Sequence, residues 1–335
     1  MKNKGKLGFF CFVLILGGVV LFAAKNEGGP ASLNSGPAIS QEKNLSQNSS
    51  VNLSQMKLSQ NNLSQNSSVK VPEIVVSSET LEQGDTLLVK IETDAETTEI
   101  NGNFGGQKIY FFRRGNFLAS VVGVGTKKEP GNYELSIGLP DGAQYKKQIK
   151  VEKTAWRVRK LKVTKELEEK GLTQTKIIEN LSLRDGPLVK AAVSSFSPEA
   201  YFDKPFIYPL KKIIDVGPFG DIRESPSGTV QHLGADLDAD TGTPVFSIND
   251  GVVVFVKDLP TYGKTIIVDH GLGIFSLYLH LDEFKVKESQ KTNRGDIIAL
   301  SGNTGYSIGP HLHFSIKAQG ASVDPIKFIK TLTGL

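Results

Sequence analysis

Cysteine is almost absent from this chain of 335 residues, which contains one, Cys11. An intramolecular disulfide is therefore excluded, and stability has to come from packing or from a bound metal. The length allows two or three compact domains at about 100 to 200 residues each, so a sizeable core can be buried.

The chain also lacks a strong excess of charge of either sign. It has 39 basic and 35 acidic residues, for a formal net charge of +4. A nucleic-acid partner usually requires a clustered basic face, so this balance argues against one. It is compatible with weak attraction to an anionic surface.

A long apolar run occurs near the N-terminus, at Leu7–Ala24, and it follows Lys2, Lys4 and Lys6. Such a run with lysines before it is typical of an export segment whose N-terminus stays in the cytoplasm. We expect residues 1–24 to be a transmembrane anchor, or a signal segment if they are cleaved. The rest of the chain is then expected in the cell envelope, outside the cytoplasmic (inner) membrane, or secreted after cleavage.

Aromatic residues are missing from residues 25–70, which are rich in Ser, Asn and Gln. The octet NLSQNSSV stands at 44–51 and again at 62–69. Because this composition cannot bury enough apolar surface to offset chain entropy, we predict a disordered linker between the membrane and the folded part.

The remaining chain is predicted to be mainly β. Residues 71–152 alternate short apolar runs with turn signals, which is typical of a β-sandwich of immunoglobulin type. Residues 153–203 have helical spacing and are expected to form a connector that packs against the last domain. Residues 204–335 return to short β-type runs separated by glycine and are expected to form an antiparallel β domain.

All histidines of the chain fall within this last domain: His232, His270, His280, His311 and His313. Side chains two apart on a strand share a face. His311, His313 and Ser315 are therefore expected on the face opposite Leu312, Phe314 and Ile316. By the same rule, Ser276, Tyr278 and His280 are expected to share a face opposite Phe275, Leu277 and Leu279.

These residues can supply a metal site. A catalytic zinc takes three protein ligands from His, Asp or Glu and keeps one position open. His232, Asp236 and one histidine of the HLH motif satisfy that requirement, and the other imidazoles remain free for proton transfer or charge stabilisation.

The motifs HxGxD, YxHL and GPHLHF occur in this order and resemble those of the lysostaphin and LytM-type zinc endopeptidases, peptidase family M23. Further similar segments are FGDIR, GTPVFSINDGVV, YGKTIIVDHG and VDPIKF, so the likeness spans about Phe206 to Ile329. The resemblance implies one Zn²⁺ per chain held by His232, Asp236 and His313. It also implies that His280 and His311 are an unliganded catalytic pair.

Three further residues have less specific predictions. Arg223 is expected to contact substrate by orienting a carboxylate, or else to form an ion pair with Asp221 or Glu224. Tyr278 is a second candidate for substrate contact. His270 lies at the end of a predicted strand and is expected to be structural or exposed at the surface.

These observations predict a zinc-dependent endopeptidase that cuts peptide stems or cross-links of bacterial peptidoglycan. Both glycyl-glycine and D-alanyl-diaminopimelyl cross-links remain open as substrates. The main alternative is a non-catalytic wall-binding or amidase-activating module on the same fold. A zinc protease acting on another protein is the third possibility.

Overall fold

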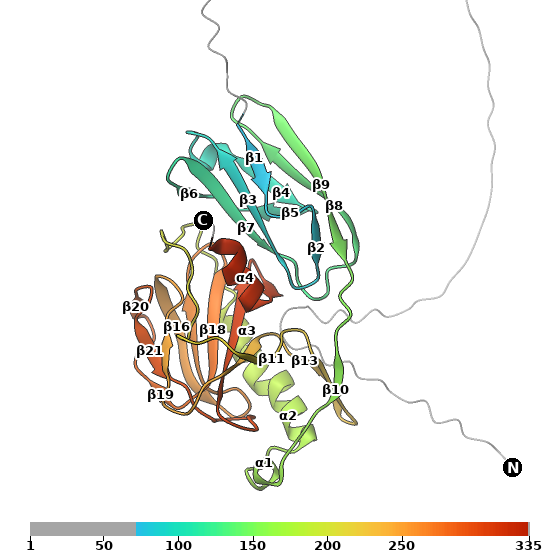
Figure 1. Ribbon diagram of the computed structural model, residues 1–335, viewed down its shortest axis with the longest axis vertical. Helices are drawn as coiled ribbons and strands as arrows, with labels where there is room; N and C mark the ends of the chain where they lie inside the picture. Colours follow the sequence, from blue (N-terminus) through green and yellow to red (C-terminus); the bar gives the residue numbers. More distant parts are fainter. Residues whose placement is uncertain (1–71, 334–335) are drawn as a thin grey trace, which may run out of the picture. The chain divides into compact units, whose positions relative to one another are not determined.

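The computed structural model describes residues 72–333 (Figure 1). The predicted membrane segment, 1–24, and the whole predicted linker, 25–70, lie outside these residues. No helix in the described range is both long and apolar enough to cross a membrane. The described residues all fall in one structural unit that is mainly β, as predicted.

Residues 74–152 form two sheets that pack face to face around a shared core. The core contains Leu87, Ile91, Leu118, Leu135 and Ile149. This is the predicted sandwich, although its assignment to the immunoglobulin type stays a prediction. One sheet has the order β1 (Ile74–Val76), β3 (Thr86–Glu92), β7 (Phe117–Gly123), β6 (Phe112–Arg114). The other has the order β2 (Thr80–Glu82), β9 (Gln144–Glu152), β8 (Gly131–Gly138), β4 (Asn101–Phe104), β5 (Gln107–Ile109), with the short helix η1 (Thr97–Glu99) before β4.

Strand β3 is buried on both faces at Leu87, Leu88 and Val89, which are three consecutive apolar residues. Leu87, Val89 and Ile91 point into the sandwich core. Leu88 belongs instead to a hydrophobic cluster that includes Phe206 and Phe328 of the C-terminal domain. The sandwich is therefore packed directly against that domain.

The connector begins with a strand that the sequence did not predict, β10 (Val158–Lys160), which pairs in parallel with β12 (Ile222–Ser225). Three short helices and a π-helical turn follow it, inside the range predicted to be helical. They are α1 (Lys165–Glu169), α2 (Gln174–Asn180), η2 (Leu181–Asp185) and α3 (Gly186–Ala192). Thr164 and Thr173 cap the first two helices, because their side chains accept hydrogen bonds from the backbone N–H of Leu167 and Lys176.

The C-terminal domain is built on an antiparallel sheet. Its strand order is β11 (Asp215–Gly217), β14 (Ala235–Asp238), β22 (His311–Ala318), β18 (Ile274–Leu281), β17 (Gly263–Asp269), β16 (Gly251–Leu259), β20 (Lys291–Thr292), with β23 (Ala321–Val323) on β22. A small second sheet has the order β15 (Pro244–Phe246), β21 (Ile297–Leu300), β19 (Glu283–Phe284). Strand β13 (Gly228–Gln231) pairs with β12, and helix α4 (Pro325–Leu332) ends the described chain.

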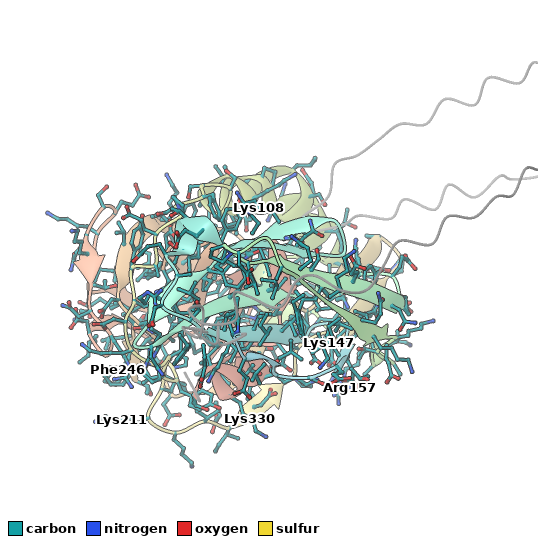
Figure 2. All side chains as sticks on the ribbon, turned by 90° about the horizontal axis from the view of Figure 1, so that it is seen from above. Lys108, Lys147, Arg157, Lys211, Phe246 and Lys330 are labelled. Atoms are coloured by element: carbon teal, nitrogen blue, oxygen red, sulfur yellow. The ribbon has the colours of Figure 1, made fainter. Side chains whose placement is uncertain are left out.

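Both faces of the main sheet are covered. Tyr278, Phe314 and the α4 residue Phe328 fill one side. On the other side, an apolar set is covered by Val189 of connector helix α3; this set is Phe255, Leu259, Ile267, Phe275, Leu277 and Leu279. Side chains occupy the space between the ribbons in Figure 2, where the exposed Lys211 and Lys330 lie at the outer edge. The connector is thus part of the packing of the C-terminal domain.

Candidate metal centre and its pocket

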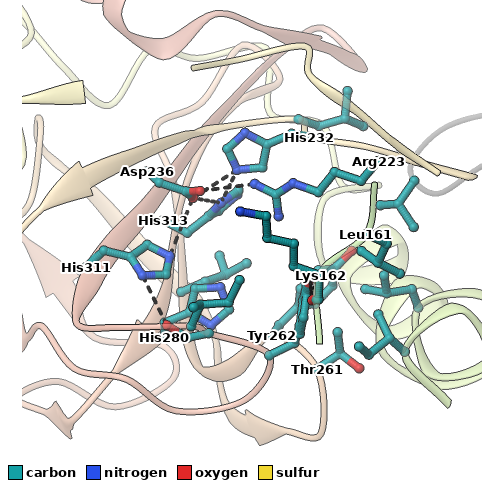
Figure 3. Close-up of a pocket in the computed structure, with 18 of the residues that line it drawn as sticks. Leu161, Lys162, Arg223, His232, Asp236, Thr261, Tyr262, His280, His311 and His313 are labelled. Atoms are coloured by element: carbon teal, nitrogen blue, oxygen red, sulfur yellow. Dashed lines mark hydrogen bonds and ion pairs between the residues drawn. The ribbon is translucent and has the colours of Figure 1, made fainter. Parts of the chain in front are cut away.

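Two neighbouring strands, β14 and β22, and the segment that precedes β14 bring the predicted metal ligands together (Figure 3). In the antiparallel pair β14–β22, Asp236 lies directly opposite His313. His232 lies between β13 and β14 and is held by a hydrogen bond from its backbone N–H to the Asp221 carbonyl, 2.7 Å. His232, Asp236 and His313 can each offer one ligand atom to a common ion.

The three candidate ligand atoms lie at nearly equal distances from one another. His232 Nε2 is 2.9 Å from Asp236 Oδ1 and 3.0 Å from His313 Nδ1. His313 Nδ1 is 2.8 Å from the same carboxylate oxygen. Ligands about 2.0 to 2.1 Å from a tetrahedral zinc have separations of roughly 3.3 Å, close to this spacing.

Each of these side chains has a second contact that fixes its orientation. His232 Nδ1 is 3.0 Å from the Pro218 carbonyl, which can only accept, so Nδ1 carries the proton and Nε2 presents a lone pair to the centre. His313 Nε2 contacts Ser315 Oγ at 2.9 Å. The other oxygen of Asp236 accepts from Arg223 at 3.2 Å. The residues therefore fit a cation, which would separate lone pairs that otherwise face one another.

The protonation states also suit a metal. Burial lowers the pKa of His313 to about 4, although the hydrogen bond to the Asp236 carboxylate opposes this shift. Burial alone raises the pKa of Asp236, but the charge and hydrogen bonds of His232, with those of His311 and His313, hold it well below its usual value. A neutral imidazole and an ionised carboxylate are the forms that bind metal.

Gly234 stands between His232 and Asp236 in the HxGxD motif. A glycine is required there because the segment lies very close to β22. A Cβ at this position would lie 2.3 Å from Ser315 Oγ and 2.5 Å from His313 Nε2. Sequence reasoning missed Gly234 and Ser315 as supporting residues. Gly234 could have been found from the glycine of the HxGxD motif. Ser315 could have been found from its position two residues after His313.

His280 and His311 form a pair of imidazoles beside the ligands, with ring centroids 4.9 Å apart. His280 Nδ1 donates to the Thr304 carbonyl at 2.8 Å, and His311 Nδ1 donates to the Gly309 carbonyl at 2.7 Å. In the neutral form both therefore present an Nε2 lone pair. His311 Nε2 is 3.5 Å from the nearer oxygen of Asp236.

The environments of these two histidines shift their pKa values in opposite directions. Burial, with the nearby charges of His311 and His313, holds the pKa of His280 well below its usual value. Burial also disfavours the charged form of His311, but the hydrogen bond and charge of Asp236 outweigh it and raise its pKa.

The prediction that Tyr278 shares a face with His280 is wrong. His280 has a left-handed backbone, with φ of 60°, and the register of β17 against β18 shifts between Lys264 and Ile266. This irregularity breaks the alternation, so Leu277, Leu279 and His280 line the pocket together. Tyr278 has no exposed surface and its hydroxyl accepts hydrogen bonds from Ser276 and the Ile248 backbone, which excludes a substrate contact in this structure.

Arg223 lines the pocket, but its ion-pair partner is neither of the residues expected from sequence. It contacts Asp236, as described above, whereas Asp221 pairs with Arg157 at 2.9 Å and Arg159 at 3.3 Å. An arginine on the outer oxygen of Asp236 orients the carboxylate by a charge-assisted hydrogen bond.

His270 lies far from this chemistry, in the core. It is completely buried, Nδ1 donates to the Asp250 carbonyl at 2.8 Å, and Nε2 contacts Ser276 Oγ at 2.8 Å. Of the two expectations for this residue, the contacts agree with a structural histidine and contradict an exposed one.

A cavity of about 560 Å³ adjoins the centre and contains all four clustered histidines and Asp236 in its lining (Figure 3). Its other walls come from the connector and from the loop Tyr306–Pro310. This volume and a mostly apolar lining with a few polar groups are typical of a ligand site.

Comparisons with known proteins give matches to part of the chain. Residues 230–325 match the model of peptidase family M23. The lipoprotein NlpD of Yersinia enterocolitica is 36% identical over 95 residues, which are 28% of this chain and 97% of NlpD.

The peptidoglycan DD-endopeptidase ShyA of Vibrio cholerae is 43% identical over 96 residues, which are 29% of this chain and 22% of ShyA. The chain thus spans about a fifth of the length of ShyA. The solved catalytic domain of lysostaphin from Staphylococcus simulans is 32% identical, with 36% of this chain and 92% of that chain covered and a TM-score of 0.31.

Proposed function

Because the chain belongs to peptidase family M23, we propose that it is a zinc-dependent endopeptidase that hydrolyses peptide cross-links of bacterial peptidoglycan. The observation that carries the proposal is the convergence of His232, Asp236 and His313 on one point, with His280 and His311 beside it at the end of a cavity. Two relatives named as peptidoglycan DD-endopeptidases, ShyA and ShyB, are 43% and 41% identical to this chain over 96 and 98 residues.

A zinc ion held by His232, Asp236 and His313 would act as a Lewis acid toward water and the substrate carbonyl. The protein supplies the proton transfers. His280 and His311, each with Nδ1–H bound to a carbonyl, present Nε2 to the cavity. One of these atoms can accept the proton of the attacking water and return it to the departing amine. Once protonated, an imidazolium also stabilises negative charge on the carbonyl oxygen.

The main alternative is a wall-binding or amidase-activating module without hydrolytic activity. Such a role does not require proton-transfer groups next to the metal ligands. The retention of three ligands and two further imidazoles in one cavity favours hydrolysis.

The proposed location follows from the sequence before residue 72. An anchor at 1–24 and a flexible linker at 25–70 would hold the folded part outside the cytoplasmic membrane. A flexible chain of about 45 residues has a root-mean-square span of roughly 35 to 40 Å, which would let the tethered site reach wall peptides.

The test is a zymogram with purified peptidoglycan as substrate and casein as a control protein. The wild-type protein with zinc is expected to clear peptidoglycan, whereas His313→Ala is expected to be inactive. Cleavage of casein alone would support the third possibility, a protease of other proteins. Absence of any cleavage by zinc-loaded wild type would contradict the proposal and favour the non-catalytic module.

A further inference from the structure

The connector forms one wall of the catalytic cavity. Apart from the metal-site residues, the lining includes a run of four connector residues from Arg159 to Lys162 and the helical residues Ile177, Leu181 and Val189. Strand β10 is paired with β12, the strand that carries Arg223. The cavity is therefore built by two segments far apart in the sequence, and the connector can contribute to substrate choice.

This wall gives the cavity more basic than acidic side chains. Asp236 is the only acidic residue in the lining, whereas the basic residues are Arg159, Lys160, Lys162 and Arg223. Arg159 is paired with Asp221 and Arg223 with Asp236. Across residues 72–333, neither Lys160 nor Lys162 has an ion pair within the protein. An anionic group entering the cavity would meet an unneutralised ammonium group.

Lys162 is held in a defined position at its backbone. The preceding residue, Leu161, is buried among the connector helices; its N–H donates to Glu224 at 2.7 Å and its carbonyl accepts from Gln174 at 2.8 Å. The carbonyl of Lys162 accepts from the Tyr306 hydroxyl at 2.7 Å. These hydrogen bonds fix the backbone at Leu161 and Lys162, so the Cα atom that carries the lysine side chain has a defined position.

The side chain of Lys162 extends into the cavity in the direction of the metal-ligating residues (Figure 3). It is exposed to solvent within the cavity. Its ammonium group therefore shares a cavity with the candidate metal ligands.

We propose that Lys162 is a specificity-determining residue that binds a free carboxylate of the substrate next to the scissile peptide bond. This proposal rests on the proposed function for the site and names its substrate class, a peptide that is anionic beside the cleaved bond. The recognition is a charge-assisted hydrogen bond from the lysine ammonium to the carboxylate. A D-alanyl-diaminopimelyl cross-link has this chemistry, because a free carboxylate is attached to the carbon that bears the scissile nitrogen. A glycyl-glycine bridge lacks it.

The experiment measures binding to the full-length protein in detergent, with zinc removed by a chelator so that no cleavage occurs. The probes are two fluorescent peptide dimers joined by a D-alanyl-diaminopimelyl bond. In one, the carboxylate beside that bond is free, and in the other it is a carboxamide. Wild type is expected to bind the free carboxylate about fivefold more tightly, a difference that shrinks with added salt.

Lys162→Gln is expected to bind both probes with the affinity that wild type has for the carboxamide, and Lys162→Arg is expected to retain the preference. The matched control is Lys165→Gln, which removes the same charge from the connector at an exposed position outside the cavity lining, and which should bind as wild type does. Thermal unfolding of each variant shows whether the fold is retained.

Three results would overturn the proposal: an unchanged preference in Lys162→Gln, an equal loss of affinity for both probes, or a wild type that does not distinguish the probes. Failure of the proposed function gives a different result. In that case the zinc-loaded protein would leave peptidoglycan intact while the carboxylate preference and its dependence on Lys162 persisted.

Discussion

At the scale of single residues, the proposed ligands and the proposed proton-transfer pair differ in where their nitrogen atoms point. His313 Nδ1 lies within 3.0 Å of both other ligands, whereas the Nδ1 atom of His280 is used by the Thr304 carbonyl. We expect His313→Ala to lose bound zinc. We expect His280→Ala to keep about one zinc per chain and to lose activity by at least about a hundredfold.

Metal analysis after dialysis, together with the rate of peptidoglycan release, checks this prediction. Ser315→Ala is a useful intermediate, because Ser315 only orients His313. It should bind zinc about tenfold more weakly than wild type. Equal zinc loss in His280→Ala and His313→Ala would show that ligand and proton-transfer roles are misassigned.

His270 gives a prediction for the pH dependence of stability. Burial lowers its pKa to about 4 in the folded state, from about 6.5 in an unfolded chain. Between these values the unfolded chain binds a proton that the folded chain does not, so the free energy of unfolding falls as the pH falls. This titration lowers the free energy of unfolding by roughly 3 kcal/mol between about pH 7 and pH 4, and it has no effect above about pH 7.

His270→Asn removes this titration and retains polar atoms at the site. Denaturant unfolding of the zinc-free proteins from pH 7 to pH 4 should therefore show a steeper loss of stability for wild type than for the variant. Other buried histidines, such as His280 and His313, titrate in both proteins and do not affect the difference. Parallel curves would contradict the role assigned to burial of His270.

At the scale of elements, the connector is joined to the C-terminal domain by Asp185, at the end of the π-helical turn η2. Its Oδ2 atom accepts from the backbone N–H groups of Thr261 at 2.7 Å and Tyr262 at 3.2 Å. The Tyr262 carbonyl in turn accepts from the N–H of His280 at 3.1 Å. One carboxylate thus links the connector, through Tyr262, to the backbone of His280, a proposed proton-transfer residue.

Asp185→Ala would leave two backbone donors without their acceptor in a buried site. We expect it to lower the free energy of unfolding by about 2 kcal/mol and to speed amide exchange at Thr261 and Tyr262. Asp185→Asn keeps one acceptor oxygen, and burial already raises the pKa of the Asp185 carboxyl, so this variant should be destabilised less. Urea unfolding and hydrogen exchange measure both effects, and equal stability of Asp185→Ala and wild type would exclude the link.

At the scale of the whole molecule, the predicted boundary between connector and last domain separates residues that pack together. Val189 covers apolar side chains on the outer face of the main sheet, and β10 extends the sheet that contains β12. A fragment of residues 204–335 loses this cover, whereas a fragment of residues 154–335 keeps it.

We expect the 204–335 fragment to melt at least about 10 °C below the 154–335 fragment, because several large apolar side chains become exposed. Differential scanning calorimetry of the two fragments measures this difference. All three proposed zinc ligands are present in both fragments, so zinc content is the control for a native centre. Equal melting temperatures would mean that the connector is a separate module.

The local sequence pattern was enough to predict the β-sandwich and the residue types of the candidate metal site. His311, His313 and Ser315 share a face because period-two alternation is a local property of an extended chain. The same rule, with turn signals, predicted the sandwich. The ligand types were also evident, since zinc selects imidazole and carboxylate regardless of the fold.

Tertiary structure decided what depends on contacts between distant segments. His280 has a left-handed backbone, and the register of β17 against β18 shifts beside it. His280 therefore lines the cavity, whereas Tyr278 lies in the core. The ion pair of Arg223 with Asp236 and the place of Lys162 in the cavity wall arise from strand pairings across many residues. Periodicity within a segment gives the direction of a side chain but carries no information about which other segment it will meet, and only the packing of the complete chain determines that partner.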